Sequence, residues 1–299
     1  MRRVTRESPA KDMEFTGRRG HSVRMRISTT ILLTDESIRP ARLARELEQR
    51  GFGGLYLPEH THIPVSRETP PPMGGELPRS YTRTLDPLVG LAVAATVTER
   101  LALGTSVTLV AQRDPIVLAK ELATLDLLSE GRVTLGVGFG WNVEEAADHG
   151  VEWRTRRALV KDRMAVMRAL WSEGPTGHEG RFASVSPSHA HPKPVRPGGP
   201  RVLVGGGAGP RLFADIAAYA DGWMPVGGGG LTDTAPRLRA AWQEAGRKGT
   251  PDLVPAFVVP SPGKLAHYRD LGAEEVILQL PDGDEATVLR ALDDYARYL

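Results

Sequence analysis

Residues 101–138 read LALGTSVTLVAQRDPIVLAKELATLDLLSEGRVTLGVG, and this stretch decides the fold. Its first part, 101–109, is a β-branched run typical of a strand. Pro115 is a favoured first residue of a helix, and the apolar residues behind it keep a helical spacing until Gly131 interrupts them. A second β-like run follows at 132–138. The stretch therefore predicts a strand, a helix and a second strand, which is the repeating unit of a parallel sheet.

The same alternation continues from residue 26 to the C-terminus. The strand candidates, separated by helical patterns, span residues 27–33, 54–58, 101–109, 132–138, 201–205, 222–226, 254–259 and 275–280. Eight such units predict an α/β fold of the (β/α)8 TIM barrel type, and a doubly wound open sheet is the alternative. Two connections are longer than a barrel needs, 60–85 after strand 2 and 174–200 after strand 4. We expect these insertion loops to be functional lids or disordered segments.

Composition and charge limit the possible functions. The chain has 299 residues, of which 40% are hydrophobic and 25% charged, as in ordinary globular proteins. It has no cysteine, which excludes disulfides, thiolate nucleophiles and cysteine-ligated metal sites. The longest apolar run, residues 88–97, is about half the length that a membrane span needs, so we expect no membrane partner.

Basic residues are concentrated at the N-terminus. Residues 1–25 hold seven basic and three acidic residues, and the remaining chain holds 31 and 33. We therefore expect 1–25 to be a basic, disordered extension and 26–299 to be a single barrel domain that binds no nucleic acid. No targeting signal is recognisable, which favours a cytoplasmic location.

In a barrel, chemistry belongs at the C-terminal ends of the strands. Residues 58–64, PEHTHIP, follow strand 2 and place Glu59 and His60 there, and histidine is a natural general acid or base. The spacing of His60 and His62 is also found in metal-dependent hydrolases. The later strand ends supply no further metal ligands, so we expect no metal site; they carry Trp141, Gly205, Pro225 and Pro260.

Two glycine-rich turns follow strands 4 and 5. In residues 136–142, GVGFGWN, alternating glycines admit a ligand close to the backbone, and Trp141 offers a flat apolar wall. In residues 205–211, GGGAGPR, free backbone N–H groups and the following helix predict a phosphate cradle. The first turn has Trp141 where a dinucleotide fingerprint needs glycine, and no P-loop motif occurs in the chain.

Together these stretches resemble the bacterial luciferase-like monooxygenase superfamily. The motifs are LYLPEHTHIP at 55–64, LGTSV at 103–107, LGVGFGWN at 135–142, VGGG at 204–207 and ADGW at 220–223. The resemblance spans residues 26–299 and is nearest to the branch of coenzyme F420-dependent oxidoreductases. It implies a barrel that binds a flavin or deazaflavin at its C-terminal mouth.

The resemblance also implies roles for individual residues. Ser106 and Val107 would form a non-prolyl cis peptide that backs the cofactor ring. Glu59 and His60 would lie beside the ring as catalytic residues, with His60 as the proton donor or acceptor, and Trp141, also assigned to the catalytic set, would wall the substrate side. The cofactor ring, its ribityl chain and its phosphate would be held by Gly138, Gly140, Asn142, Gly205, Gly206, Gly207 and Arg211.

The leading interpretation is an oxidoreductase that transfers a hydride between coenzyme F420 and a small organic substrate. An FMN-dependent monooxygenase that uses reduced flavin and oxygen is the first alternative. A non-catalytic flavin or deazaflavin carrier and a metal-dependent hydrolase are the others. The resemblance further implies a homodimer.

Overall fold

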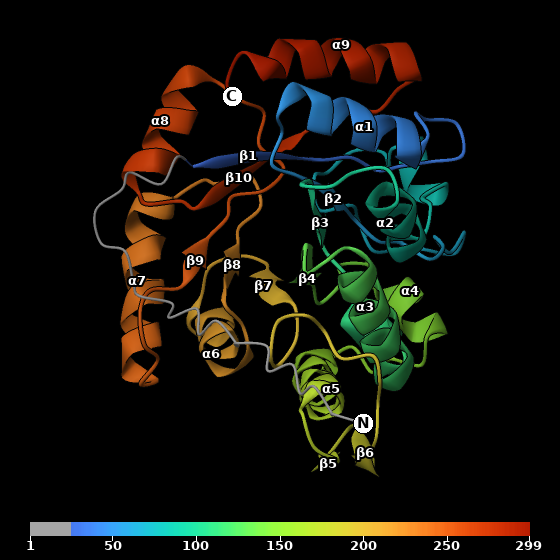
Figure 1. The fold of residues 1–299 in the computed structure, drawn as a ribbon, viewed down its shortest axis with the longest axis vertical. Helices are drawn as coiled ribbons and strands as arrows, with labels where there is room; N and C mark the ends of the chain where they lie inside the picture. Colours follow the sequence, from blue (N-terminus) through green and yellow to red (C-terminus); the bar gives the residue numbers. More distant parts are fainter. Residues whose placement is uncertain (1–24) are drawn as a thin grey trace, which may run out of the picture.

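The computed structural model describes residues 25–299, and its centre is one sheet of parallel strands (Figure 1). The order of the eight strands within these residues is β10-β1-β2-β3-β4-β7-β8-β9. Their bounds are β1 (Arg26–Thr30), β2 (Gly54–Leu57), β3 (Ala102–Thr105), β4 (Val133–Val137), β7 (Arg201–Gly205), β8 (Gly222–Met224), β9 (Asp252–Leu253) and β10 (Glu275–Gln279). The extension expected at 1–25 lies outside the described residues, except for Met25, which is buried.

The sheet closes between β10 and the segment that follows β9. The backbone N–H of Val258 donates to the Ile277 carbonyl at 3.2 Å, and the N–H of Gln279 donates to the Val258 carbonyl at 3.0 Å. This closure confirms the predicted (β/α)8 barrel and excludes the open sheet. The strand expected at 254–259 is wrong in its bounds, because β9 ends at Leu253 and Phe257 has a φ of 57°, in the left-handed region that interrupts a strand.

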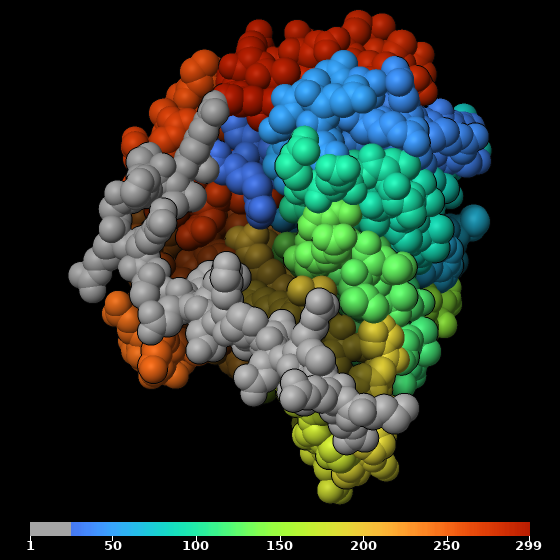
Figure 2. All heavy atoms as spheres, in the orientation of Figure 1, coloured from blue at the N-terminus to red at the C-terminus, as the bar shows by residue number. Residues whose placement is uncertain are grey.

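Helices cover the outside of the barrel, and α1 and α9 lie side by side in both Figure 1 and Figure 2. Several begin with proline, which is favoured there because the N–H of the first helical residue has no partner within the helix, and proline has no N–H. The helices are α1 (Pro40–Arg50), α2 (Pro87–Ala95), α3 (Pro115–Leu128), α4 (Val143–Asp148), α5 (Arg156–Trp171), α6 (Pro210–Tyr219), α7 (Leu231–Glu244), α8 (Pro262–Asp270) and α9 (Glu285–Ala296), with 3-10 turns η1 (Arg79–Thr82) and η2 (Val110–Gln112). In the described part of the chain, none of them has the length and apolar character of a membrane span.

Both predicted insertions are present. The first connects β2 to α2 and contains η1. The second contains an antiparallel hairpin, β5 (Thr176–Glu179) and β6 (Ser184–Ser188), which the sequence did not predict. Every residue of these two strands is exposed or half-buried, so the hairpin has no apolar alternation that could reveal it. It is attached to α5, where Asp162 Oδ2 accepts the N–H of Phe182 at 2.7 Å.

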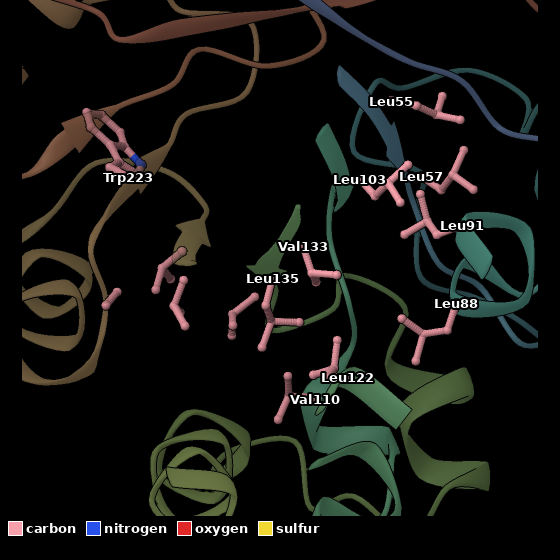
Figure 3. Packing of buried hydrophobic residues seen from close by; sticks show 14 of the residues in the cluster. Leu55, Leu57, Leu88, Leu91, Leu103, Val110, Leu122, Val133, Leu135 and Trp223 are labelled. Carbon is pink, nitrogen blue, oxygen red and sulfur yellow. The ribbon is translucent and has the colours of Figure 1, made fainter. Parts of the chain in front are cut away.

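Strand residues alternate between the barrel interior and the outer layer. Leu55 and Leu57 point outward and share a buried cluster with Leu88 and Leu91 of α2 (Figure 3). Between them, Tyr56 points inward, as a period of two requires. The interior cluster consists of Tyr56, Leu203, Met224, Val254, Ala256 and Ile277.

A charged cluster forms the floor of the barrel, at the N-terminal ends of the strands. Fully buried Glu275 accepts hydrogen bonds from Arg26 at 2.5 Å, Arg201 at 3.0 Å and the Tyr56 hydroxyl at 3.1 Å. Arg201 also pairs with Asp252 at 2.7 Å. Burial alone raises the pKa of Glu275, but the two guanidinium groups outweigh it, and the pKa lies below its ordinary value.

Candidate active site

The Ser106–Val107 peptide bond at the end of β3 is cis, as the resemblance implies. The Ser106 hydroxyl lies 2.8 Å from that of Thr30, and Val107 packs on top of the interior cluster. A Cβ added to Gly138 would lie 2.1 Å from Val107 Cγ2, and one added to Gly205 would lie 2.9 Å from Val107 Cγ1. The two glycines therefore make room for Val107. The sequence predicted that Gly138 lets a ligand approach the backbone, but the space beside Gly138 is filled by Val107.

The turn after β7 keeps open space at the mouth. A Cβ on Gly207 would meet nothing within 4 Å, and Gly206 has a φ of +136°, which favours glycine. The indole N–H of Trp223 donates to the Gly206 carbonyl at 3.0 Å and fixes the turn. The first N–H groups of α6 follow, and Arg211 lies exposed in its first turn. The turn thus has the space and the donors that the predicted phosphate cradle requires.

His60 is held tightly beyond the end of β2. Its side chain is 7% exposed, and Nδ1 lies 2.8 Å from Glu145 Oε2 on α4. On the other side, the indole N–H of Trp141 donates to His60 Nε2 at 3.2 Å. The Tyr81 ring lies 5.3 Å from the His60 ring, and the Thr84 hydroxyl donates to the His60 carbonyl at 3.1 Å. The structure therefore brings together His60 and Trp141, two residues that the sequence predicted for the site.

Glu59 lies in a different environment. Its side chain is buried, and its two oxygens accept hydrogen bonds from Arg113 Nε at 2.6 Å and the Leu109 N–H at 2.7 Å. Burial raises the pKa of Glu59, and the charge of Arg113 offsets only part of this. Since both oxygens are occupied, Glu59 holds the segment that follows the cis peptide. Its catalytic role stays a prediction.

Asn142 carries a buried polar group that lacks a partner among the described residues. The residue is 1% exposed, and its Oδ1 accepts the N–H of Glu145 at 3.4 Å, which caps α4. Its Nδ2 has no hydrogen-bond partner within residues 25–299. An unsatisfied buried donor costs about 1–3 kcal/mol, so this atom fits an acceptor on a bound cofactor. Two residues earlier, Gly140 has a φ of +75°, a backbone conformation that favours glycine.

The loop after β2 is docked onto α4 and the β1–α1 connection. Glu144 Oε1 accepts the N–H groups of Glu68 and Thr69 at 2.9 and 3.1 Å. Hydrogen bonds from the Thr69 side chain and from these amides lower the pKa of Glu144 to about 2. Two arginines of the loop are paired with carboxylates of the β1–α1 connection: Arg79 with Glu36, and Arg83 with Asp35.

The sequence did not reveal Glu145 and Tyr81 as neighbours of His60. The only local signal at Glu145 is the spacing from Asn142, which indicates a helix cap. Tyr81 lies in an insertion without a recognisable motif. Across residues 25–299, no three His, Asp or Glu side chains are grouped so that they could hold a metal ion.

The fold and the motifs place the chain in a known family: it belongs to the luciferase-like monooxygenases, whose family model matches residues 21–264. An uncharacterized protein of Mycobacterium tuberculosis is 43% identical over 279 residues, which cover 92% of this chain and 96% of that protein. A phthiodiolone/phenolphthiodiolone dimycocerosates ketoreductase of Mycobacterium kansasii is 30% identical over 237 residues, 75% of this chain and 62% of that protein.

Two solved structures share this fold, and each of them aligns with 92% of this chain. An F420-dependent secondary alcohol dehydrogenase in complex with an F420–acetone adduct has a TM-score of 0.71 at 17% identity and is covered to 98%. A monooxygenase from Streptomyces bottropensis has a TM-score of 0.70 at 19% identity and is also covered to 98%. At these identities, the likeness establishes the fold alone.

Proposed function

We propose that the protein is a coenzyme F420-dependent oxidoreductase that transfers a hydride between the deazaflavin ring and a small alcohol or ketone. The observation that carries the proposal is the buried His60, whose Nε2 faces the indole N–H of Trp141. The substrate class is supported by the relative that is named a ketoreductase, and it agrees with the secondary alcohol dehydrogenase among the structural neighbours.

The residues at the mouth fit such a cofactor. Val107 forms a raised apolar platform, and the unpaired Nδ2 of Asn142 offers a donor to the ring or its ribityl chain. Gly206, Gly207 and Arg211 would hold the phosphate. When bound, the deazaflavin supplies the carbon that gives or takes the hydride, and the protein supplies position and electrostatics.

His60 handles the proton in this proposal. Oxidation of an alcohol releases a hydroxyl proton, and reduction of a ketone needs one, so a group at the substrate oxygen must accept or donate it. His60 Nε2 is suited to this task because Glu145 occupies Nδ1. Trp141 would wall the substrate and exclude water, while the platform and the phosphate turn hold the reacting atoms in register.

The test is a pair of assays on the purified protein. One assay combines reduced F420 with a set of small ketones, and the other combines oxidised F420 with alcohols. In both, the visible absorbance of the coenzyme reports its oxidation state. We expect substrate-dependent changes without oxygen uptake. Incorporation of oxygen into the substrate with reduced FMN would instead establish the monooxygenase alternative, which the family name and the neighbour from Streptomyces bottropensis favour. Tight binding without any turnover would identify a non-catalytic carrier.

We also propose that the protein is a homodimer that pairs through α2 and α3. Large apolar side chains are exposed on these adjacent helices, with exposed fractions of 65% for Val89, 48% for Ile116 and 55% for Val117. Exposed apolar patches commonly mark interaction surfaces. Light scattering should give the mass of a dimer for the wild type and of a monomer for a Val89→Asp/Val117→Asp variant. A monomeric wild type would reject the proposal.

A further inference from the structure

Glu145 lies directly behind His60 and can only accept hydrogen bonds there. Its side chain is 1% exposed, so water does not compete for its oxygens. Oε1 accepts the backbone N–H of Thr61 at 3.2 Å, and Oε2 lies 2.8 Å from His60 Nδ1. An ionised carboxylate has no proton to donate. The contact therefore requires a hydrogen on His60 Nδ1.

Trp141 imposes the same arrangement from the other side. An indole N–H is a donor only, and Trp141 Nε1 lies 3.2 Å from His60 Nε2. Nε2 must then offer its lone pair and carry no hydrogen. The hydrogen bonds through the His60 ring thus have one direction, from the Trp141 N–H into Nε2 and from the Nδ1–H into Glu145.

The remaining contacts keep the His60 ring in this place. The Thr84 hydroxyl binds the His60 carbonyl, and the ring of Tyr81 lies 5.3 Å away. Arg67 lies above the Trp141 ring, with Cζ 5.6 Å from the ring centroid. None of these groups is bonded to the His60 ring nitrogens in the described part of the chain, so Glu145 and Trp141 alone determine which nitrogen is protonated.

We infer that Glu145 is the positioning residue of this site: it fixes the Nδ1–H tautomer of His60 and makes Nε2 the atom that exchanges a proton. The inference rests on the proposed function only where it assigns that proton to the substrate. The tautomer itself is a property of the protein without coenzyme.

The arrangement has a consequence for Trp141. When Nε2 takes up a proton it becomes a donor, and two donors cannot share a hydrogen bond. The Trp141 N–H must then leave Nε2, and the substrate oxygen takes its place. In this proposal, the Trp141 N–H and the substrate oxygen would therefore contact the same atom, His60 Nε2, in turn.

The tautomer can be measured by long-range 1H–15N correlation of protein labelled with 15N-histidine, without coenzyme and at neutral pH. The His60 signals are identified by their loss in His60→Gln. We expect the Nδ1–H form in the wild type and in Trp141→Phe, where Glu145 alone holds it. In Trp141→Phe/Glu145→Ala, we expect the Nε2–H form that free histidine prefers to appear.

Each other outcome overturns the inference. An Nε2–H form in the wild type would show that the hydrogen-bond direction is wrong. If the Nε2–H form appeared in Trp141→Phe, Trp141 and not Glu145 would determine the tautomer. If the double variant kept the Nδ1–H form, Glu145 would not be needed to fix the tautomer. The first two measurements decide the matter even if the double variant does not fold.

Kinetics separate this inference from the proposed function. With F420 and a substrate, Glu145→Ala should lower kcat by about one to two orders of magnitude and leave KM and coenzyme affinity near the wild-type values. Asp148→Ala, on the exposed side of the same helix, is the matched control and should retain wild-type turnover. Turnover retained in Glu145→Ala would contradict the positioning role. The expected tautomers without any F420 turnover would contradict the proposed function alone.

Discussion

The two ends of the barrel use buried polar groups in opposite ways. At the floor, Arg26, Glu275, Arg201 and Asp252 pair with one another, and the Tyr56 hydroxyl completes the cluster. At the mouth, the Nδ2 of Asn142 is left without a partner among the described residues, and the turn at Gly207 borders open space. The floor therefore pairs its buried polar groups with one another, whereas the mouth leaves a buried donor unpaired.

The largest effect is expected at the mouth, on activity. His60→Ala should lower turnover by about 10²- to 10⁴-fold, because the proton loses its carrier, and should leave coenzyme affinity nearly unchanged. His62→Ala is the control, since His62 belongs to the same motif but pairs with exposed Asp148. Steady-state kinetics and a coenzyme titration measure the two quantities. An equal loss of both in His60→Ala would contradict the assigned role.

At the floor, the expected effect is on stability. Glu275→Gln removes the buried negative charge that forms ion pairs with Arg26 and Arg201. It should lower the free energy of unfolding by about 3–5 kcal/mol. Urea denaturation measures this change. Gly207→Ala at the mouth should leave stability unchanged, because its Cβ meets no atom within 4 Å. Equal destabilisation by the two variants would remove the contrast between the ends.

A substitution at Gly138 tests whether coenzyme binding at the mouth also depends on the packing around Val107. Gly138→Ala places a Cβ 2.1 Å from Val107 Cγ2, so the platform must shift. We expect a loss of about 1–3 kcal/mol in stability, as for other overpacked sites, and at least about a tenfold weaker coenzyme affinity. Denaturation and fluorescence titration would be compared with wild type. Wild-type affinity in this variant would show that Val107 does not support the ring.

The smallest expected effect is a loosening of the docked loop at acid pH. The pKa of Glu144 is lowered to about 2 in the folded protein. The stability that the Glu144 carboxylate gives to the docked loop is therefore fully present above its unfolded pKa near 4.5, and it is lost as the pH falls from there through about 2. Hydrogen exchange at Glu68 and Thr69, corrected for intrinsic rates, should show protection decreasing over this range. In Glu144→Gln, protection should be low throughout. Protection that is independent of pH in the wild type would contradict the assignment.

The sequence predicted the parts of this molecule that depend on local pattern. The stretch 115–129 was expected to be helical, and α3 begins at Pro115 and ends at Leu128, because apolar spacing and a terminal proline are local signals. The strand-end motifs placed His60 and Trp141 correctly at one mouth, since parallel strands end on the same side.

Other features depend on contacts between distant segments, which no local pattern reveals. Gly138 makes room for Val107, 31 positions earlier, and Glu145 binds His60, 85 positions earlier. The early end of the strand at Leu253 was missed because the positive φ of Phe257 is unusual for a bulky residue. Such positions become visible only when the barrel has brought its strand ends together.

The central claim is that this mouth binds a deazaflavin, and a fluorescence titration of the wild-type protein with F420 and, separately, with FMN tests it most directly. The account predicts micromolar or tighter binding of F420 and at least about tenfold weaker binding of FMN. Tighter binding of FMN, or no binding of either compound, would contradict it.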